Sequence, residues 1–285
     1  MPINEQQLIQ RQNHIGSSDM AAILGLNPYQ TAYDIWLQKT GQLDYQEPNA
    51  AMFIGTMLED GVLNFAENQL GPLVRNVHVE HDNGILASNI DAEVVEDGRP
   101  VEAKTVGIMR GFTDKDQWGD GGSDNVPDYC YIQTHVHMIC AKKDLCYVPA
   151  LLAGRGLLLF HVPFSQDVAD VILEKAEGFW NENVLKATPP IDSQPTLDVV
   201  KRMKRTPNKE VQIDKQLILT LEEAKEAERL AKKRKDEAQA MILAAMGDAE
   251  CGVADGLKCT YFTYKRKGYT VQDSEYRTLY TKKER

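Results

Sequence analysis

Residues 91–104 read DAEVVEDGRPVEAK, which is two strand-like runs on either side of Asp97-Gly98. An Asp-Gly pair between such runs is a strong signal for a β-hairpin. A two-residue turn at this point pairs Asp91 with Lys104 across the hairpin. Because side chains alternate along a strand, Glu102 and Lys104 point to the same face, and Asp91 lies diagonal to Glu102. The segment therefore predicts a hairpin that gathers carboxylates around one lysine.

The predicted hairpin also brings like charges together. The same register sets Glu93 opposite Glu102, which is destabilising unless a cation lies near the pair. Carboxylate oxygens hold Mg²⁺, which polarises a phosphoryl group and lowers the pKa of an attacking water. A lysine beside them can stabilise the negative charge that develops. The pattern indicates phosphodiester hydrolysis, with a solvated charged hairpin as the alternative, since Glu-x-Lys alone is a common tripeptide.

Two predicted helices add polar groups to this site. Glu59 lies on a helix over about 51–69, on a small, apolar face, so its carboxylate needs a metal or a lysine as partner. A helix-edge glutamate that reaches solvent is the alternative. Gln133 and His137 share a face, at i and i+4, of a helix over about 127–141. We expect Gln133 to position the lysine or a water, the alternative being an ordinary polar face.

The cysteines and histidines do not favour a zinc site. The five cysteines form no CxxC pair and suit neither a disulfide framework nor an iron–sulfur cluster. His135 and His137 are two residues apart and do not face one another on a helix. Reduced, buried thiols indicate a cytoplasmic protein. The polar N-terminus and the lack of a long apolar run predict no signal peptide and no membrane span.

The charge is unevenly distributed along the chain. The formal net charge of −10 is the sum of an acidic part, residues 1–190 with a net −14, and a basic part, residues 191–285 with a net +4. Composition alone would favour a function without DNA, including that of an acidic scaffold. A metal-dependent nuclease nevertheless tolerates an acidic body, because its carboxylates hold cations that face the phosphates.

Turn and helix signals divide the 285 residues into a body, a linker and an appendage. In the body we expect helices over about 17–24, 31–40, 51–69, 127–141 and 166–184, and strands over about 85–95, 100–105, 145–152 and 157–163. A proline-rich run, 188–195, is the clearest linker. A long charged helix over 213–246 and a β-hairpin turning at Asp255-Gly256 follow. The expected divisions are 1–188, 189–212 and 213–285.

Five motifs occur in a fixed order along the body. They are RQNHIGSSDMAAILGL (11–26), PYQTAYDIWLQKTG (28–41), GTMLE (55–59), Asp91 with Glu102-Ala103-Lys104, and WGDGGSDNVPDYCYIQTHVHM (118–138). Together they resemble the YqaJ-like viral recombinase nucleases, relatives of lambda exonuclease in the PD-(D/E)xK superfamily. The resemblance covers about 10–185. It implies an α/β, restriction-endonuclease-like core, a mixed central sheet flanked by helices, with a C-terminal helical arm and a small β element.

The resemblance also implies roles for the catalytic residues. Asp91 and Glu102 would hold Mg²⁺, or Mn²⁺ in its place, together with the backbone carbonyl of Ala103. Glu59 would complete the site toward a second metal. Lys104 would act on the attacking water, and Gln133 matches the first glutamine of the family's helix motif.

Further residues match the family at the edges of the site. Arg11 and Ser18 correspond to the arginine and serine that bind the 5′-terminal phosphate of the digested strand. His135 and Asn89 stand where relatives carry other side chains. This departure leaves their supporting roles around the metal ligands open.

The function implied by the resemblance is Mg²⁺-dependent digestion of duplex DNA from 5′ ends, which leaves a 3′ single strand for phage-type recombination. Relatives form rings around DNA, so a homo-oligomer is expected, with a single-strand annealing protein as a partner and the host cytoplasm as its place. One alternative is an endonuclease or nickase with the same site. Another is a catalytically silent protein that binds DNA ends.

The basic tail offers a second contact with DNA. Residues 258–269 mix basic and aromatic side chains with few acids, a composition that can follow a phosphate backbone and stack on unpaired bases. On a strand these side chains would alternate between two faces, and the alternative is an ordinary amphipathic strand with a charged edge. The candidate contacts are Lys258, Tyr261, Tyr264, Lys265, Arg266 and Lys267.

Overall fold

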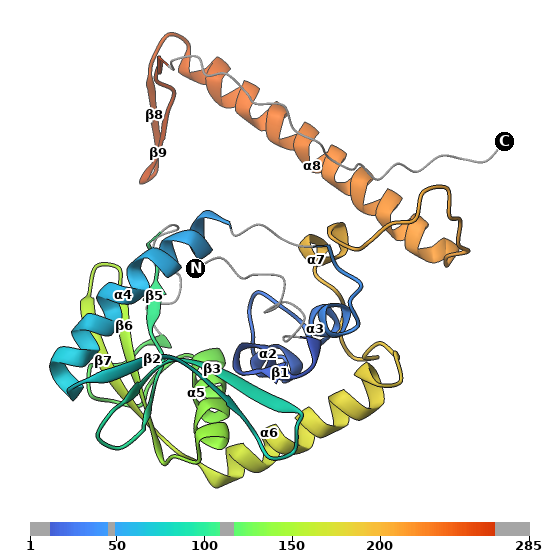
Figure 1. Cartoon of the computed structure of the whole chain (residues 1–285). Helices are drawn as coiled ribbons and strands as arrows, with labels where there is room; N and C mark the ends of the chain where they lie inside the picture. Colours follow the sequence, from blue (N-terminus) through green and yellow to red (C-terminus); the bar gives the residue numbers. More distant parts are fainter. Residues whose placement is uncertain (1–11, 45–48, 109–116, 266–285) are drawn as a thin grey trace. The chain divides into compact units, whose positions relative to one another are not determined.

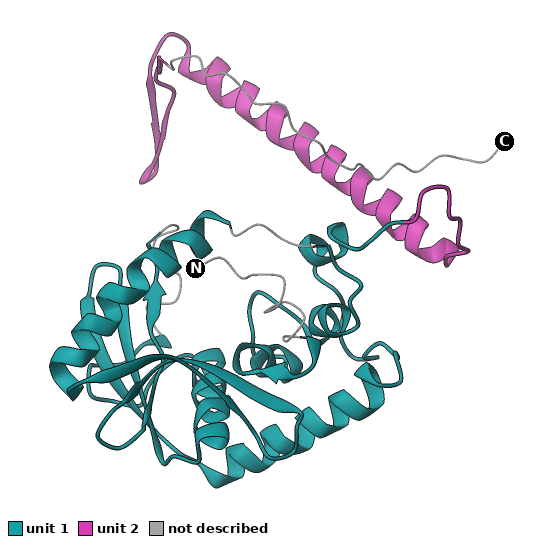
Figure 2. Ribbon diagram, in the orientation of Figure 1, with its two compact units in different colours: residues 1–205 teal, residues 206–285 magenta. Residues whose placement is uncertain are grey.

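The computed structural model describes residues 12–44, 49–108 and 117–265 (Figure 1). The chain divides into two compact units, residues 1–205 and residues 206–285, which Figure 2 shows in different colours. The first unit contains every described residue of the predicted catalytic site.

A seven-stranded mixed sheet forms the centre of the first unit. Its strands are β1 (Ile15–Gly16), β2 (Leu73–Glu80), β3 (Leu86–Val94), β4 (Pro100–Val101), β5 (Lys104–Val106), β6 (Leu145–Leu152) and β7 (Gly156–Pro163). β3 runs parallel to β1 and antiparallel to β2 and β4. β6 runs parallel to β4 and β5 and antiparallel to β7. The predicted α/β class with a mixed sheet is confirmed.

Helices cover both faces of this sheet. The helices of the first unit are α2 (Ser17–Ile23), α3 (Ala32–Lys39), α4 (Ala50–Leu70), α5 (Asp128–Ala141), α6 (Gln166–Gly178), the π-helix η2 (Phe179–Val184) and α7 (Leu197–Lys201). On β6, Tyr147 packs in the cluster that contains Leu63 of α4, whereas its neighbours Cys146 and Val148 pack in the cluster that contains Met138 of α5. Since neighbours on a strand point to opposite faces, α4 and α5 lie on opposite sides of the sheet.

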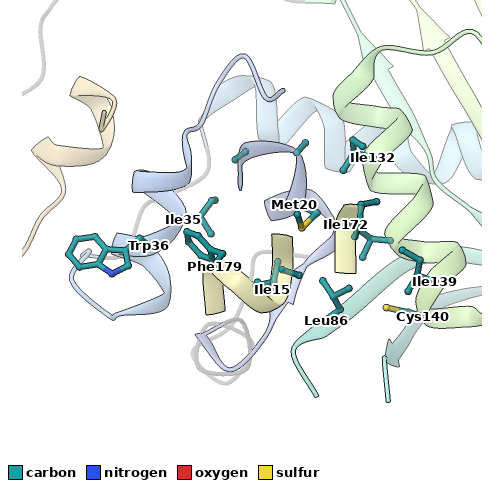
Figure 3. Packing of buried hydrophobic residues seen from close by; sticks show 14 of the residues in the cluster. Ile15, Met20, Ile35, Trp36, Leu86, Ile132, Ile139, Cys140, Ile172 and Phe179 are labelled. Carbon is teal, nitrogen blue, oxygen red and sulfur yellow. The ribbon is translucent and has the colours of Figure 1, made fainter. Parts of the chain in front are cut away.

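The largest group of buried apolar residues lies where α2, α3, α5 and α6 meet (Figure 3). Its members include Ile15, Met20, Ile35, Leu86, Ile132, Ile172 and Phe179, which are almost completely buried. Burying one such aliphatic side chain is worth about 1.5–3 kcal/mol, so this cluster contributes strongly to the stability of the unit. It also fixes the position of α5, the helix that carries Gln133 and His137.

The register of the hairpin differs from the predicted one. Glu93 pairs with Pro100, not with Glu102, and Ala92 pairs with Val101. The Val94 N–H donates to the Arg99 carbonyl at 3.0 Å and the Gly98 N–H donates to the Val94 carbonyl at 2.8 Å, so these bonds close a loop of four residues, 95–98. Gly98 adopts a φ of 67°, which glycine tolerates without a steric penalty. A two-residue turn was therefore wrong, and the strand pairing shifts by two residues.

Two other segments differ from the expected secondary structure. β2 was not among the predicted strands, although its burial alternates strictly along its length. The run 189–205, expected as linker, packs on the first unit: the Thr196 N–H donates to Asp34 Oδ1 at 2.9 Å, the Tyr33 N–H donates to Ser193 Oγ at 3.1 Å, and Val199 is buried. Asp34 is itself fully buried, so it anchors this run to α3.

The second unit is a long helix followed by a hairpin, as predicted. The helix is α8 (Lys215–Met246), with Asp214 as its N-cap, and the hairpin consists of β8 (Cys251–Ala254) and β9 (Leu257–Thr260) joined at Asp255-Gly256. α8 has no buried residue. Among the residues that the structure describes, no helix combines the length and apolar character needed to cross a membrane.

Candidate active site

The predicted catalytic residues meet beside the break between β4 and β5. Asp91 lies on β3, Lys104 begins β5, and Glu102 and Ala103 occupy the break. The Glu102 N–H donates to the Tyr147 carbonyl at 2.9 Å, and the Ala103 N–H donates to Asp91 Oδ2 at 2.8 Å. The backbone thus leaves its pairing with β3 at Glu102, and the Asp91 carboxylate holds the backbone at Ala103 in place.

Lys104, Glu102 and Gln133 form a closed triangle of hydrogen bonds. Lys104 Nζ donates to Glu102 Oε1 at 2.6 Å and to Gln133 Oε1 at 2.8 Å, while Gln133 Nε2 donates to Glu102 Oε1 at 2.6 Å. In its two contacts the Gln133 amide accepts through Oε1 and donates through Nε2, as its chemistry requires. The ammonium group is therefore held in one place by two acceptors, and Gln133 occupies the position that the sequence predicted for it beside the lysine.

The second oxygen of Glu102 contacts His137, a histidine to which the sequence pattern assigned no role. His137 Nε2 lies 2.8 Å from Glu102 Oε2, and His137 Nδ1 is hydrogen-bonded to Ser88 Oγ. His137 and Ser88 are both fully buried. The spacing of His137 from Gln133, four residues on one helix, was the signal that could have identified it.

Opposite charges determine the ionisation of the central pair. Burial alone would raise the pKa of the Glu102 carboxyl, but the Lys104 ammonium and the His137 ring outweigh burial and hold that pKa at about 2. Burial alone would lower the pKa of Lys104, but the Glu102 carboxylate outweighs it and raises that pKa. The pair is therefore an ionised carboxylate against an ammonium group.

Asp91 and Glu59 show the opposite behaviour. Burial, followed by the nearby charge of Glu102, raises the pKa of Asp91 well above its ordinary value. Burial and the charge of Glu102 also raise the pKa of Glu59 on α4. The carboxyl groups of Asp91, Glu102 and Glu59 thus share one electrostatic environment that carries an excess of negative charge.

These residues fit a hard divalent cation. Within residues 12–44, 49–108 and 117–265, no three His, Cys, Asp or Glu side chains form a group that could hold a metal ion. Mg²⁺ needs no such group, since it is usually bound by one or two carboxylates and keeps several waters. Asp91, Glu102 and the Ala103 carbonyl supply oxygen donors. A cation among them would relieve the repulsion from Glu102, which adds to burial in raising the pKa of Asp91.

The two candidate supporting residues lie outside this network. His135 Nδ1 donates to the Tyr131 carbonyl at 2.8 Å, and its Nε2 accepts the Ser165 N–H at 3.1 Å. Asn89 Oδ1 is hydrogen-bonded to His78 Nδ1 at 2.8 Å on the exposed side of β3. Neither side chain contacts Asp91, Glu102 or Lys104 in these bonds, so the structure gives them other roles.

The remaining candidates lie in three different regions. Ser18 is exposed near the start of α2, while Arg11 and the tail residues Arg266 and Lys267 fall outside the described residues. Lys258 is on β9, but Tyr261, Tyr264 and Lys265 come after the strand ends at Thr260. The predicted alternation of two strand faces therefore does not extend over 261–265, although Tyr261 and Tyr264 are strongly exposed.

Comparisons of sequence point to one family. A family model described as the YqaJ-like viral recombinase domain matches residues 8–144. The YqaJ protein of Bacillus subtilis (strain 168) is 29% identical to this chain over 194 residues, a match that covers 65% of this chain. The matched region is 58% of the Bacillus protein, so the chain spans less than two-thirds of that relative's length.

Comparisons of structure agree on the fold. An alkaline exonuclease, LHK-Exo from Laribacter hongkongensis, is similar to this chain with a TM-score of 0.51 at 17% identity, over 65% of this chain and 93% of the exonuclease. The same enzyme in complex with dAMP gives a TM-score of 0.50 at 18% identity, over the same shares of the two chains. At this level of identity the likeness establishes a shared fold.

Proposed function

Residues 8–144 match the model of the YqaJ-like viral recombinase domain, and on this basis we propose that the chain is a Mg²⁺-dependent exonuclease that acts on duplex DNA. It digests one strand from the 5′ end and leaves a 3′ single strand for recombination. The observation that carries the proposal is the Lys104 ammonium, held between Glu102 and Gln133 next to the carboxyl-rich cluster. That arrangement suits hydrolysis of a phosphodiester.

Each residue of the cluster has a separate task in this proposal. Bound Mg²⁺, or Mn²⁺ in its place, supplies a Lewis acid and a water of lowered pKa. Asp91 and Glu102 hold the cation with the Ala103 carbonyl, and Glu59 extends the negative cluster toward a second ion. Lys104 stabilises the charge on the attacking oxygen.

The preference for a 5′ end is assigned to two residues near the N-terminus. Arg11 offers a guanidinium fork and Ser18 a hydroxyl, which together suit a terminal phosphate dianion. Ser18 is exposed near the start of α2, where DNA can reach it. The family match begins at residue 8 and includes both residues.

The proposal extends to partners as well. The protein acts as a homo-oligomer on duplex ends and hands the 3′ strand to a single-strand annealing protein. The net charge of +4 over residues 191–285, against −14 over residues 1–190, favours the tail as the part that adds affinity for the phosphate backbone.

The decisive experiment measures which labelled end of a linear DNA duplex the protein releases first. Linear duplex carrying a label at either the 5′ or the 3′ end is incubated with the protein in Mg²⁺, in Mn²⁺ and in a chelator, with the Glu102→Gln protein prepared in parallel as a control for contaminating nucleases. The proposal expects early release of the 5′ label as a mononucleotide, retention of the 3′ label, and no reaction in the chelator. Release from 3′ ends first would reverse the proposed polarity.

Closed circular duplex separates the exonuclease from its rivals. An exonuclease leaves it intact, because no end is present. Nicking or linearisation of the circle would instead assign an endonuclease with the same metal site. Binding of linear ends without any cleavage, in either metal, would assign a silent end-binding protein.

A further inference from the structure

Helix α5 contacts both oxygens of the Glu102 carboxylate. Gln133 and His137 lie four residues apart on this helix and therefore project from successive turns of one face. Gln133 Nε2 lies 2.6 Å from Oε1, and His137 Nε2 lies 2.8 Å from Oε2. A carboxylate held at both oxygens by one helix cannot rotate without losing one of these hydrogen bonds.

The neighbours of the His137 ring determine where its proton lies. Lys104 and Gln133 both donate to Oε1 of Glu102, so this carboxylate acts as the acceptor and His137 Nε2 must carry the hydrogen in its contact with Oε2. The hydroxyl of Ser88 lies against Nδ1 and can donate to it. A continuous chain of hydrogen bonds then runs from Ser88 on β3, through the ring, to Glu102 at the break between β4 and β5.

We propose that His137, oriented by Ser88, is a positioning residue that fixes the Glu102 carboxylate for metal binding. This inference rests on the proposed function, which assigns Glu102 as a metal ligand. His137 is 0% exposed, so it cannot touch DNA and acts through Glu102 alone. Hydrogen-bond partners behind a metal ligand orient it, and losing one typically costs about 10–100-fold in metal affinity or activity.

His135 provides an internal comparison on the same helix. It is also 0% exposed and also makes two hydrogen bonds, to the Tyr131 carbonyl and from the Ser165 N–H. Because Ser165 is the N-cap residue of α6, His135 ties α5 to the next helix. The two histidines are thus equally buried but have different partners, and of the two it is His137 that contacts Glu102.

The test compares three variants. His137→Gln keeps a donor, since the glutamine Nε2 is the same number of bonds from Cβ as the histidine Nε2. His137→Leu removes the donor at similar volume, and His135→Leu removes the matched histidine. We expect His137→Leu to lower kcat and Mn²⁺ affinity by about 10–100-fold. The KM for DNA should stay within about twofold, because no DNA contact is lost.

The pattern across the variants decides between positioning and folding. His137→Gln should recover most of the kcat and of the Mn²⁺ affinity. His135→Leu should lower the Tm at least as much as His137→Leu, but change Mn²⁺ affinity far less. Equal losses of Mn²⁺ affinity in His137→Leu and His135→Leu would contradict the proposal. It would also be contradicted if His137→Gln had no higher kcat or Mn²⁺ affinity than His137→Leu.

Two readouts are independent of cleavage. Mn²⁺ binding is measured by calorimetry without DNA, and ¹⁵N NMR of the metal-free protein reports which ring nitrogen of His137 is protonated. The proposal expects a hydrogen on Nε2, whereas a ring protonated on Nδ1 alone would overturn it. A protein that shows this Nε2–H and binds Mn²⁺ but cuts no DNA would refute the proposed exonuclease and still support the positioning role.

Discussion

Lys104 and Glu102 contact each other at 2.6 Å between Nζ and Oε1, yet their exposure differs: the lysine side chain is 19% exposed and the glutamate side chain 5%. The carboxylate accepts from Lys104 and Gln133 at Oε1 and contacts His137 at Oε2. Lys104 is therefore the member of the pair that an approaching phosphate can meet first, while Glu102 holds it in position.

Substitution of either residue should abolish cleavage. Lys104→Ala removes the charge that stabilises the attacking oxygen, and Glu102→Gln removes a proposed metal ligand. Removing one preorganised charge-stabilising group typically costs about 10²–10³-fold in kcat. We expect at least that loss in each variant, measured as nucleotide release from linear duplex, with circular dichroism as the control for folding. Near wild-type cleavage by either variant would show that the site is misassigned.

Asp91→Asn should stabilise the metal-free protein while eliminating its activity. The raised pKa of Asp91 reflects burial and the charge of Glu102, so the ionised carboxyl costs stability. The asparagine Oδ1 can still accept the Ala103 N–H that now bonds to Asp91 Oδ2. Each kcal/mol gained should raise the Tm by roughly 2–4 °C. Unchanged or lower Tm in the variant, measured in chelator at neutral pH, would contradict this account of the cluster.

The same residue predicts a pH dependence of stability in chelator. Between the ordinary value of 3.8 and the raised folded value, the folded state binds more protons at Asp91 than the unfolded state does. This contribution to stability is therefore present at low pH and is lost as the pH rises through the folded pKa. The Tm of wild type relative to Asp91→Asn should fall over that window, and parallel curves of Tm against pH would mean that Asp91 does not titrate as described.

Mg²⁺ should raise the Tm of wild type more than that of Asp91→Asn.

Sequence patterns predicted the cluster better than its register. The Asp-Gly signal placed the hairpin, but a two-residue turn could not be distinguished from the four-residue loop that the Gly98 hydrogen bond closes. Glu93 therefore faces Pro100. Glu102 and Lys104 still meet because their contact depends on local spacing along the chain and not on cross-strand pairing.

Roles that depend on long-range packing were the ones missed. The sequence placed His137 on the same helix face as Gln133, but His135 was the histidine considered for a supporting role, because nothing local shows which histidine meets Glu102. Ser88 lies 49 positions from His137, and only the folded sheet brings them together. The run 189–205 resembled a linker because its prolines are a local signal, whereas its anchor, Asp34, is distant in sequence.

Digestion should depend on the phosphate at the 5′ end. Because Arg11 and Ser18 are assigned to that phosphate, wild type should degrade 5′-phosphorylated duplex faster than 5′-hydroxyl duplex. Arg11→Ala should remove most of the difference, since a charge-assisted contact is lost. The measurement is the ratio of the initial rates on the two substrates for each protein. Equal rates on both ends by wild type would leave Arg11 as an ordinary surface residue.

Truncation after Arg205 should separate catalysis from DNA affinity. Residues 206–285 form the second unit, and α8 has no buried residue, so their removal exposes little core. We expect the shortened protein to remain folded and to retain metal binding. Its DNA affinity should fall and become less salt-dependent, because fewer counterions are released when the lysines and arginines of residues 206–285 are missing. The slope of affinity against salt concentration is the quantity to compare.

The position of the cut is part of this prediction. Truncation after Thr188 also removes Thr196 and the buried Val199, which leaves the carboxylate of Asp34, fully buried in the intact chain, without one of its backbone donors. That shorter protein should have a lower Tm than the one ending at Arg205, since a buried acceptor without its hydrogen bond is costly. Equal Tm values would mean that the run 189–205 adds nothing to the stability of the fold.

The longer truncated protein, which ends at Arg205, tests the second unit itself. If its DNA affinity, its salt slope and its oligomeric state equal those of the full chain, the second unit neither binds DNA nor docks another subunit.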